Sequence, residues 1–411
     1  MRIDLISEHA SPLAALGGVD SGGQNVHVAD LARALARCGH QVAVHTRRDD
    51  PGLPERVEAA PGVTVEHVPA GPPLPLPKDE LLIHMPAFGA HLARRWAWEP
   101  PEVVHAHFWM SGLAALDGTR GSGVPVVQTF HALGSVKRRH QGAADTSPPR
   151  RLALERKLGR EVALVIATCS DELTELARMD LPPGRVAVVP CGVDLDRFRP
   201  DGRRARRGDR PRILSLGRLV PRKGVATTIE ALAAVPGAEL VIAGGDASTE
   251  EERDRLAALA RACGVSERVR MVGQVPRDAV PVLLRSADVV VSVPWYEPFG
   301  MVPLETMACG VPLIASAVGG HLDSVTDGRT GLLVPPRDPD ALARGLRELL
   351  ADPGRRATLG AAAAERARSH YGWDRIARET ERCYRRVLAS GDSSDLVRAR
   401  AAGGAGTKVS P

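Results

Sequence analysis

Short apolar runs alternate with longer amphipathic stretches through most of the chain. The apolar runs have the length of buried strands, and the amphipathic stretches repeat apolar residues at helical spacing. We predict strands at 3–6, 41–46, 63–68, 103–107, 124–130, 162–168 and 186–189, and in the second half at 213–216, 240–244, 269–272, 287–293 and 313–315. We predict helices at 24–37, from about 150 to the next strand, and at 227–235, 250–263, 279–285, 338–352, 354–369 and 373–390. This alternation is typical of an α/β fold with parallel sheets.

The chain divides into two such series, with an arginine-rich segment at 203–212 between them. We therefore predict two doubly wound Rossmann-like domains, at 1–200 and 201–372, each long enough for its own core. A final helix at 373–390 and a disordered tail at 391–411 complete the expected organisation. The stretch TDGRTGLLVPP is expected to be a short loop.

Composition and charge narrow the class of function. The net charge is +5, and the segment 203–212, with six Arg and one Asp, accounts for all of it. Because aromatic residues make up only 3% of the chain, we expect no nucleic-acid partner. The six cysteines lack metal-ligand spacing, and no apolar run is long enough to span a membrane. We therefore expect a soluble, cytoplasmic protein.

A glycine-rich loop follows the first predicted strand. It contains Gly17, Gly18, Gly22 and Gly23 and leads into the helix at 24–37. The loop lacks the GxGxxG spacing of a dinucleotide fold, so NAD is not predicted. Glycines at a helix start either let a ligand approach the backbone or simply form a turn, and the sequence leaves both interpretations open.

Histidines stand at the ends of two predicted strands. His131 follows the strand at 124–130, at the edge where ligands of open α/β sheets gather, and we count it as a candidate site residue. His105 and His107 share another strand. Because no third ligand lies near this pair in the sequence, we predict no metal site.

The stretch VPWYEPFGMVPLETMACGVP carries the clearest chemical signal. Glu297 lies in a loop after a buried strand, and Glu305 lies eight positions later in the first turn of a short predicted helix. The amides of Gly300, Met301 and Val302 at this helix start lack partners within the helix, so they can bind an anion. The pattern predicts an anion site between two carboxylates, which fits a diphosphate flanked by sugar hydroxyls.

Two cations follow the first strand of the second domain. Arg218 and Lys223 lie in the loop GRLVPRKG. In a parallel sheet this loop and the loop of Glu297 reach the same edge, so the four charged groups converge there. Together they describe a site for a nucleotide-diphosphate sugar. Taken singly, Glu305 also fits a helix-dipole role, and the two cations also fit a solvated surface.

These motifs resemble the family-four retaining glycosyltransferases of the two-Rossmann (GT-B) type. The likeness rests on EPFGMVPLE, GRLVPRKG and SAVGG, and it extends from residue 1 to about residue 388. The opening SEHASPLAALGGVDSGGQNVHV resembles the branch that contains mycothiol-pathway inositol-phosphate N-acetylglucosaminyltransferases and sucrose-phosphate synthases. The resemblance implies two domains that face each other across a cleft, with the C-terminal helix crossing back to the first domain.

The resemblance also implies roles for the residues that meet the reacting groups. Arg218 and Lys223 would bind the donor diphosphate. Glu297 and His131 would contact the donor sugar. The implied reaction is retaining transfer of a hexose or N-acetylhexosamine from a nucleotide-diphosphate sugar, with UDP favoured, to a hydroxyl of a small polar acceptor. No metal or other cofactor is expected.

Further residues are implied in nucleotide and acceptor binding. Glu305 would bind the ribose, the backbone near Val275 would meet the nucleobase, and Gly23 would approach the donor phosphates. The implied acceptor residues are His9, Asn25, Lys78 and Arg151.

The chain departs from the implied acceptor pattern at two positions. Phe108 stands where the inositol-phosphate enzymes carry a tyrosine, and Ala132 stands where they carry a threonine. The expected acceptor is therefore a cyclitol, a sugar or a phosphate of either. The alternatives are a sucrose-phosphate-synthase-like transfer to a sugar phosphate and a non-catalytic nucleotide-sugar-binding protein. A homodimer is left open.

Overall fold

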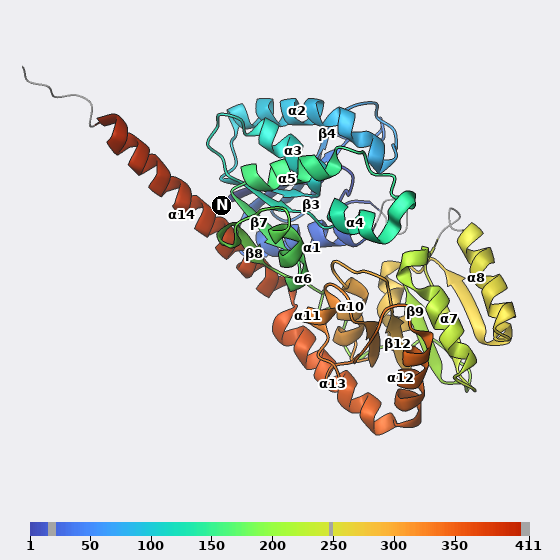
Figure 1. Cartoon of the computed structure of the whole chain (residues 1–411). Helices are drawn as coiled ribbons and strands as arrows, with labels where there is room; N and C mark the ends of the chain where they lie inside the picture. The colour runs from blue at the N-terminus through green and yellow to red at the C-terminus, as the bar shows by residue number, and fades with distance from the viewer. Residues whose placement is uncertain (15–21, 246–249, 404–411) are drawn as a thin grey trace, which may run out of the picture.

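A computed structural model describes residues 1–14, 22–245 and 250–403 of the chain. Figure 1 shows two α/β domains, with the long helix α14 (Trp373–Gly403) running from the second domain along the first. The predicted pair of Rossmann-like domains is therefore confirmed. Gly17 and Gly18 of the predicted glycine-rich loop lie outside the described residues, as does the chain from 404 onward.

The first domain is built on an eight-stranded sheet in the order β3-β4-β2-β1-β5-β6-β7-β8. Its strands are β1 (Arg2–Ile6), β2 (Gln41–Arg47), β3 (Arg56–Ala60), β4 (Val63–Val68), β5 (Val103–His107), β6 (Val126–Thr129), β7 (Leu164–Ala167) and β8 (Val186–Val188). The pairs are parallel except at the edge, where β3 runs antiparallel to β4. The sequence did not predict β3, because RVEAA is short and only partly buried.

Helices cover both faces of this sheet. They are α1 (Gly23–Arg37), α2 (Met85–Trp98), α3 (Trp109–Gly118), α4 (Gly134–Gln141), α5 (Arg151–Glu161) and α6 (Ser170–Ala177). One apolar core lies between the sheet and α2, α3 and α5, and the other lies between the sheet, α1 and α14. The sequence missed α2, α3, α4 and α6. In α3 the reason is composition, since WMSGLAALDG is apolar nearly all round and has little helical periodicity.

The second domain has a six-stranded parallel sheet in the order β11-β10-β9-β12-β13-β14. Its strands are β9 (Arg212–Leu216), β10 (Glu239–Ala243), β11 (Val269–Gly273), β12 (Val289–Ser292), β13 (Leu313–Ser316) and β14 (Leu332–Val334). The expectation that TDGRTGLLVPP is only a loop is wrong, because β14 lies within it. This edge strand has three residues and turn-forming neighbours, so pairing with β13 defines it rather than its own pattern.

The helices of the second domain lie close to their predicted positions, except for the short helix His321–Ser324, which was not predicted. They are α7 (Val225–Ala233), α8 (Glu250–Ala262), α9 (Val280–Leu284), α10 (Met301–Ala308), α11 (His321–Ser324), α12 (Pro339–Ala351) and α13 (Pro353–His370).

Helices α12 and α13 both begin with an aspartate cap followed by a proline. The Asp338 side chain accepts a hydrogen bond from the Ala341 amide at 2.8 Å, and Asp352 accepts one from Arg355 at 2.8 Å, each just before a proline. Such caps satisfy amides that the helix itself leaves without partners.

The chain passes between the domains twice, after β8 and before α14. The two crossings lie side by side, since the Val193 amide donates to the Tyr371 carbonyl at 2.7 Å. A Cβ on Gly192 would lie 2.4 Å from the Trp373 ring, so only glycine fits beneath this tryptophan. Trp373 and Tyr384 of α14 are buried in the core that contains β1 and α1. The prediction that the last helix crosses back to the first domain is therefore confirmed.

Helix α14 is longer than predicted. The sequence pattern predicts a helix to 390 and a disordered tail from 391, but the helix continues through Gly403. The added stretch contains good helix formers in LVRARAA, and the helix stops at the first glycine that follows them. The tail beyond this point is outside the described residues.

Candidate active site

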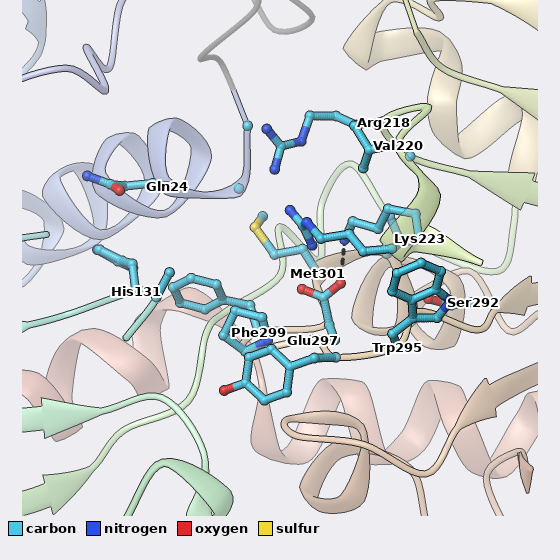
Figure 2. A pocket seen from close by; sticks show the side chains of 18 of the residues that line it. Gln24, His131, Arg218, Val220, Lys223, Ser292, Trp295, Glu297, Phe299 and Met301 are labelled. Atoms are coloured by element: carbon cyan, nitrogen blue, oxygen red, sulfur yellow. Dashed lines mark hydrogen bonds and ion pairs between the residues drawn. The ribbon is translucent and has the colours of Figure 1, made fainter. Parts of the chain in front are cut away.

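A cavity of about 510 Å³ lies between the two domains. Its walls come from the ends of strands and the starts of helices in both halves of the chain, as Figure 2 shows. The predicted residues that line it are His9, Gly23, Asn25, Lys78, His131, Arg151, Arg218, Lys223, Glu297, Met301 and Val302. Three predicted residues do not line it, namely Val275, Gly300 and Glu305.

Lys223 and Glu297 form an ion pair in the wall of the second domain (Figure 2). Lys223 ends a short turn after β9, and Glu297 lies in the loop after β12. Gly224 allows the two loops to meet, since it has a φ of +74° and a Cβ there would lie 2.0 Å from the Val293 carbonyl oxygen. The pattern PRKG therefore brings Lys223 to the carboxylate.

The electrostatics of this pair favour the charged form of Glu297. Burial raises the pKa of Glu297, but Lys223, His321 and Arg222 together outweigh that effect and bring the pKa down to about 2. Burial lowers the pKa of Lys223, and Glu297 partly restores it. The pair thus places a carboxylate and an ammonium group at the cavity wall, where both can bind polar groups of a ligand.

A third cation, Arg222, joins this wall and was not predicted. It lines the cavity beside Arg218, and burial lowers its pKa. Its carbonyl accepts the Trp295 amide at 2.8 Å, which ties the two loops together. The only signal in the sequence was its position between two predicted cations.

The motif SAVGG, residues 316–320, packs against the backbone of the loop that carries Glu297. Gly319, with a φ of +45°, packs so closely that a Cβ would lie 2.2 Å from the Glu297 carbonyl oxygen. The Gly320 amide donates to the same oxygen at 2.9 Å. The two glycines therefore fix the backbone that carries the carboxylate.

Helix α10 begins at the cavity, as its sequence predicted. Gly300 has the left-handed conformation, with a φ of +74°, and precedes the helix without lining the cavity. Met301 and Val302 do line it. The first amides of a helix have no partners within it, so they give this wall a partial positive charge.

Glu305 lies behind this helix start. It is 3% exposed, and it forms an ion pair with Arg277 that the sequence did not predict. Burial raises the Glu305 pKa, while Arg277 opposes the shift. Neither Glu305 nor the nearby Val275 lines the cavity, so the structure does not bring these two predicted nucleotide ligands together with the other residues.

The first domain approaches α10 through its glycine loop. Gly23 is the first residue of α1, and a Cβ there would lie 3.2 Å from the Met301 sulfur. The Asn25 side chain accepts the Gly22 amide at 3.0 Å and donates to the Ser11 carbonyl at 3.0 Å. Asn25 therefore fixes the loop, and its polar atoms are already engaged in the protein.

His131 follows β6 and adopts an unusual backbone conformation for a non-glycine residue, with a φ of +62°. Its Nε2 lies 2.9 Å from Nδ1 of His107, and its ring lies 4.9 Å from that of Phe299 (Figure 2). Burial lowers the pKa of both histidines well below the usual range. His131 is therefore a neutral side chain at the cavity wall.

Cations also gather around Phe108 in the first domain. Lys78 Nζ lies 5.5 Å from the centre of this ring and the Arg151 guanidinium lies 5.2 Å from it, while the His9 ring packs against its edge. Arg151 donates to Glu155 at 2.7 Å and also to the Ala132 carbonyl. The site thus joins an apolar ring to cationic groups, which suits an anionic part of a ligand.

Lys137 adds another cation to this wall and was not predicted as a site residue. It lines the cavity and donates to the Ser147 hydroxyl at 2.9 Å. Its Nζ lies 3.1 Å from an Asp145 carboxylate oxygen. The carboxylates of Asp145 and Glu155 partly balance the positive charge around Phe108.

One group of metal-ligating side chains lies together among the described residues. One ring nitrogen each of His27, His107 and His131 lies within 4.8 Å of the other two. His105, which the sequence analysis paired with His107, bonds instead to the Tyr384 hydroxyl at 2.7 Å and to Thr129 at 2.9 Å. The sequence could not reveal the group, because its three members are far apart in the chain.

Two family models match the chain. The model of the Glycosyltransferase Family 4 matches residues 21–197, and the model of the Glycosyl transferases group 1 matches residues 198–366. Among the described residues, we find no helix that has the length and apolar character needed to cross a membrane.

Similar proteins extend the comparison to nearly the whole chain. A D-inositol 3-phosphate glycosyltransferase from Acidothermus cellulolyticus is 39% identical, covering 94% of this chain and 91% of that protein. A D-inositol 3-phosphate glycosyltransferase 2 from Catenulispora acidiphila is 36% identical, covering 94% and 95%. The solved sucrose-phosphate synthase from Thermosynechococcus elongatus is 34% identical with a TM-score of 0.88, covering 95% and 99%. Two Rossmann-like domains, a charged cavity between them and these matches together show that the chain belongs to the family-four glycosyltransferases of the GT-B type.

Proposed function

We propose that the protein moves a hexose or N-acetylhexosamine from a nucleotide-diphosphate sugar, UDP-linked in the first instance, to a hydroxyl of a small phosphorylated acceptor, with retention at the anomeric carbon. The observation that carries this proposal is the Lys223–Glu297 pair in the cavity between the domains. Its ammonium group suits a diphosphate and its carboxylate suits sugar hydroxyls. A cation for the diphosphate and a carboxylate for the sugar hydroxyls therefore lie next to each other.

The donor diphosphate would bind between Arg218, Lys223 and the start of α10. These groups meet at one edge of the second sheet. When the donor breaks, negative charge grows on the departing diphosphate, and fixed cations and amide dipoles stabilise that charge without reorganising. Glu297 would hold the sugar hydroxyls, and His131 would approach the sugar from the first domain.

In the proposed step, the bond between the anomeric carbon and the diphosphate oxygen breaks. The acceptor hydroxyl oxygen bonds to the same face of that carbon, and its proton passes to the departing phosphate. Positioning of the two substrates supplies much of the rate enhancement. The cations already balance the diphosphate charge, so we propose that the reaction needs no metal ion.

Glu305 would bind the ribose only after its ion-pair partner Arg277 moves away. In the structure the Arg277 guanidinium forms an ion pair with the Glu305 carboxylate. The ribose hydroxyls would replace the guanidinium as hydrogen-bond donors to Glu305. This exchange is a specific requirement that the donor complex has to meet.

The acceptor would bind beside Phe108, with its phosphate near Lys78, Lys137 and Arg151. Relatives named D-inositol 3-phosphate glycosyltransferase support a cyclitol phosphate, and the sucrose-phosphate synthase supports a sugar phosphate. The wall formed by Phe108 and Ala132 offers no side-chain hydroxyl. It therefore favours an acceptor that presents an apolar ring edge at this point.

The test is a transfer assay with matched donors and acceptors. The full chain would be incubated with UDP-glucose or UDP-GlcNAc, each with inositol phosphate, hexose phosphates or the same acceptors without phosphate. Mass spectrometry should find a product only with a phosphorylated acceptor, and NMR of that product should show the donor's anomeric configuration. Tight donor binding with neither transfer nor donor hydrolysis would instead indicate a non-catalytic binding protein.

A further inference from the structure

We propose that His27, His107 and His131 form a binding site for one transition-metal ion of the zinc class, directly behind the cavity wall. The three residues come from α1, from the end of β5 and from the loop after β6. Their exposed fractions are 5%, 0% and 4%, and one ring nitrogen of each lies within 4.8 Å of the others. Imidazole is a common ligand of zinc, copper, nickel and cobalt ions.

The hydrogen bonding of two of these rings is incomplete. His107 Nδ1 and His131 Nε2 lie 2.9 Å apart and share one hydrogen bond. The remaining nitrogens, His107 Nε2 and His131 Nδ1, are buried and have no hydrogen-bond partner. A buried polar atom without a partner costs free energy. Coordination through His107 Nδ1 and His131 Nε2 would replace their shared hydrogen bond by two bonds to the metal, and it would leave the other two nitrogens as they are.

His27 is already oriented by a contact on one side of its ring. Its Nδ1 lies 3.2 Å from the Cys191 sulfur, which is itself buried. When Nδ1–H donates to the sulfur, the lone pair of the ring lies on Nε2. Ligating histidines usually have the second nitrogen bound in this way, because the contact fixes the tautomer and the ring orientation.

The required movement is small. A tetrahedral zinc ion with Zn–N distances of about 2.0–2.1 Å holds its ligand nitrogens about 3.3 Å apart. The His107 and His131 nitrogens, now 2.9 Å apart, would separate slightly, and the third nitrogen would move inward through side-chain rotation. The fold therefore brings the ligands close to coordinating distance without a metal.

The surroundings favour a metal ion of borderline softness, such as zinc, over magnesium or calcium. The His27 ring packs 5.8 Å from Phe299 and 5.3 Å from Trp373, measured between ring centres. The three ligands are imidazoles and the group includes no carboxylate. Magnesium and calcium prefer several oxygen ligands, whereas zinc and its neighbours bind imidazole well.

Metal binding should also slow the transfer reaction. His131 lines the cavity and would contact the donor sugar, so a metal bound to its ring would change both its position and its charge. This consequence rests on the proposed function, whereas metal binding itself does not. The site would therefore act as an inhibitory one.

The experiment uses the full chain after treatment with EDTA and removal of the chelator. Addition of CoCl₂ should produce the intense visible bands of tetrahedral cobalt, and ZnCl₂ should bleach them with one ion per chain. The variant H27F should lose the bands. The variant H91F makes the same exchange on α2, outside the group, and should keep them.

The binding and transfer results can be separated. If the wild-type chain gives no tetrahedral cobalt bands, or if folded H27F binds cobalt as tightly as wild type, the metal site is wrong. ZnCl₂ should slow transfer by wild type and H91F several-fold more than transfer by H27F, and MgCl₂ should not. If no donor and acceptor pair reacts at all, the proposed function fails, but the cobalt titration still decides the metal site.

Discussion

Replacing Lys223 by methionine tests the donor site most directly. The side chain keeps a similar length and loses only its charge. Lys223 pairs with Glu297, which is buried, so K223M leaves a carboxylate without its nearest cation. The variant therefore changes stability and catalysis by two separable routes.

The stability effect follows from burial. Removing one partner of a buried ion pair costs about 3–5 kcal/mol. The Lys223 side chain is 24% exposed and Arg222 also stabilises the Glu297 charge, so we expect the low end, about 3 kcal/mol. For a domain of this size that loss lowers Tm by about 6–12 °C. K157M, at an exposed lysine of α5 that is 65% exposed, is the control and should change Tm little.

The catalytic effect follows from the diphosphate. Loss of one fixed group that stabilises transition-state charge lowers kcat by about 10²–10³-fold. The double variant K223M/E297Q removes both charges, so Tm should recover most of its loss while turnover stays low. We would measure Tm by calorimetry and initial rates well below Tm. Turnover of K223M within threefold of wild type, or recovery of turnover in the double variant, would refute the assigned role.

The remaining predictions concern the acceptor, acid stability and metal dependence. K78A should raise KM for a phosphorylated acceptor about tenfold or more and leave KM for the donor unchanged, because a charge-assisted contact contributes about 1.5–3 kcal/mol; an unchanged acceptor KM would contradict it. Glu297 has a folded pKa of about 2 against an ordinary 4.5, so the stability it provides is complete above about pH 5 and is lost as the pH falls toward 2. Urea midpoints should fall across this window in wild type and less steeply in E297Q. EDTA should not abolish transfer, and loss of activity that MgCl₂ or MnCl₂ restores would show that the reaction requires a metal.

The sequence predicted much of this fold because most elements carry their own pattern. Strands such as β10 and β12 are continuous apolar runs, and α12 begins at a clear aspartate–proline start. Elements defined by their neighbours were missed, as with the edge strands β3 and β14. Their pairing partners are visible only once the sheet has formed.

The site residues also divide into those that the sequence pattern could predict and those that it could not. Arg218, Lys223 and Glu297 could be placed together because they follow parallel strands of one sheet. The partner of Glu305 could not be found, since Arg277 reaches it from a different loop. The same holds for the cluster of His27, His107 and His131. Contacts between distant segments depend on the directions of side chains, and the sequence pattern does not reveal these directions.

The paired crossings between the domains limit how the molecule can move. A single connecting segment would let the second domain swing and twist in many directions, whereas two adjacent segments joined through Val193 and Tyr371 act as one narrow hinge. Opening of the cavity is then expected to be largely a bend about this line, which would separate Gly23 from Met301 at the start of α10. Truncation before Trp373 would remove one of the two attachments and uncover an apolar face of the first domain. Helix α14 is thus a mechanical part of the enzyme, although no described residue of this helix lines the cavity.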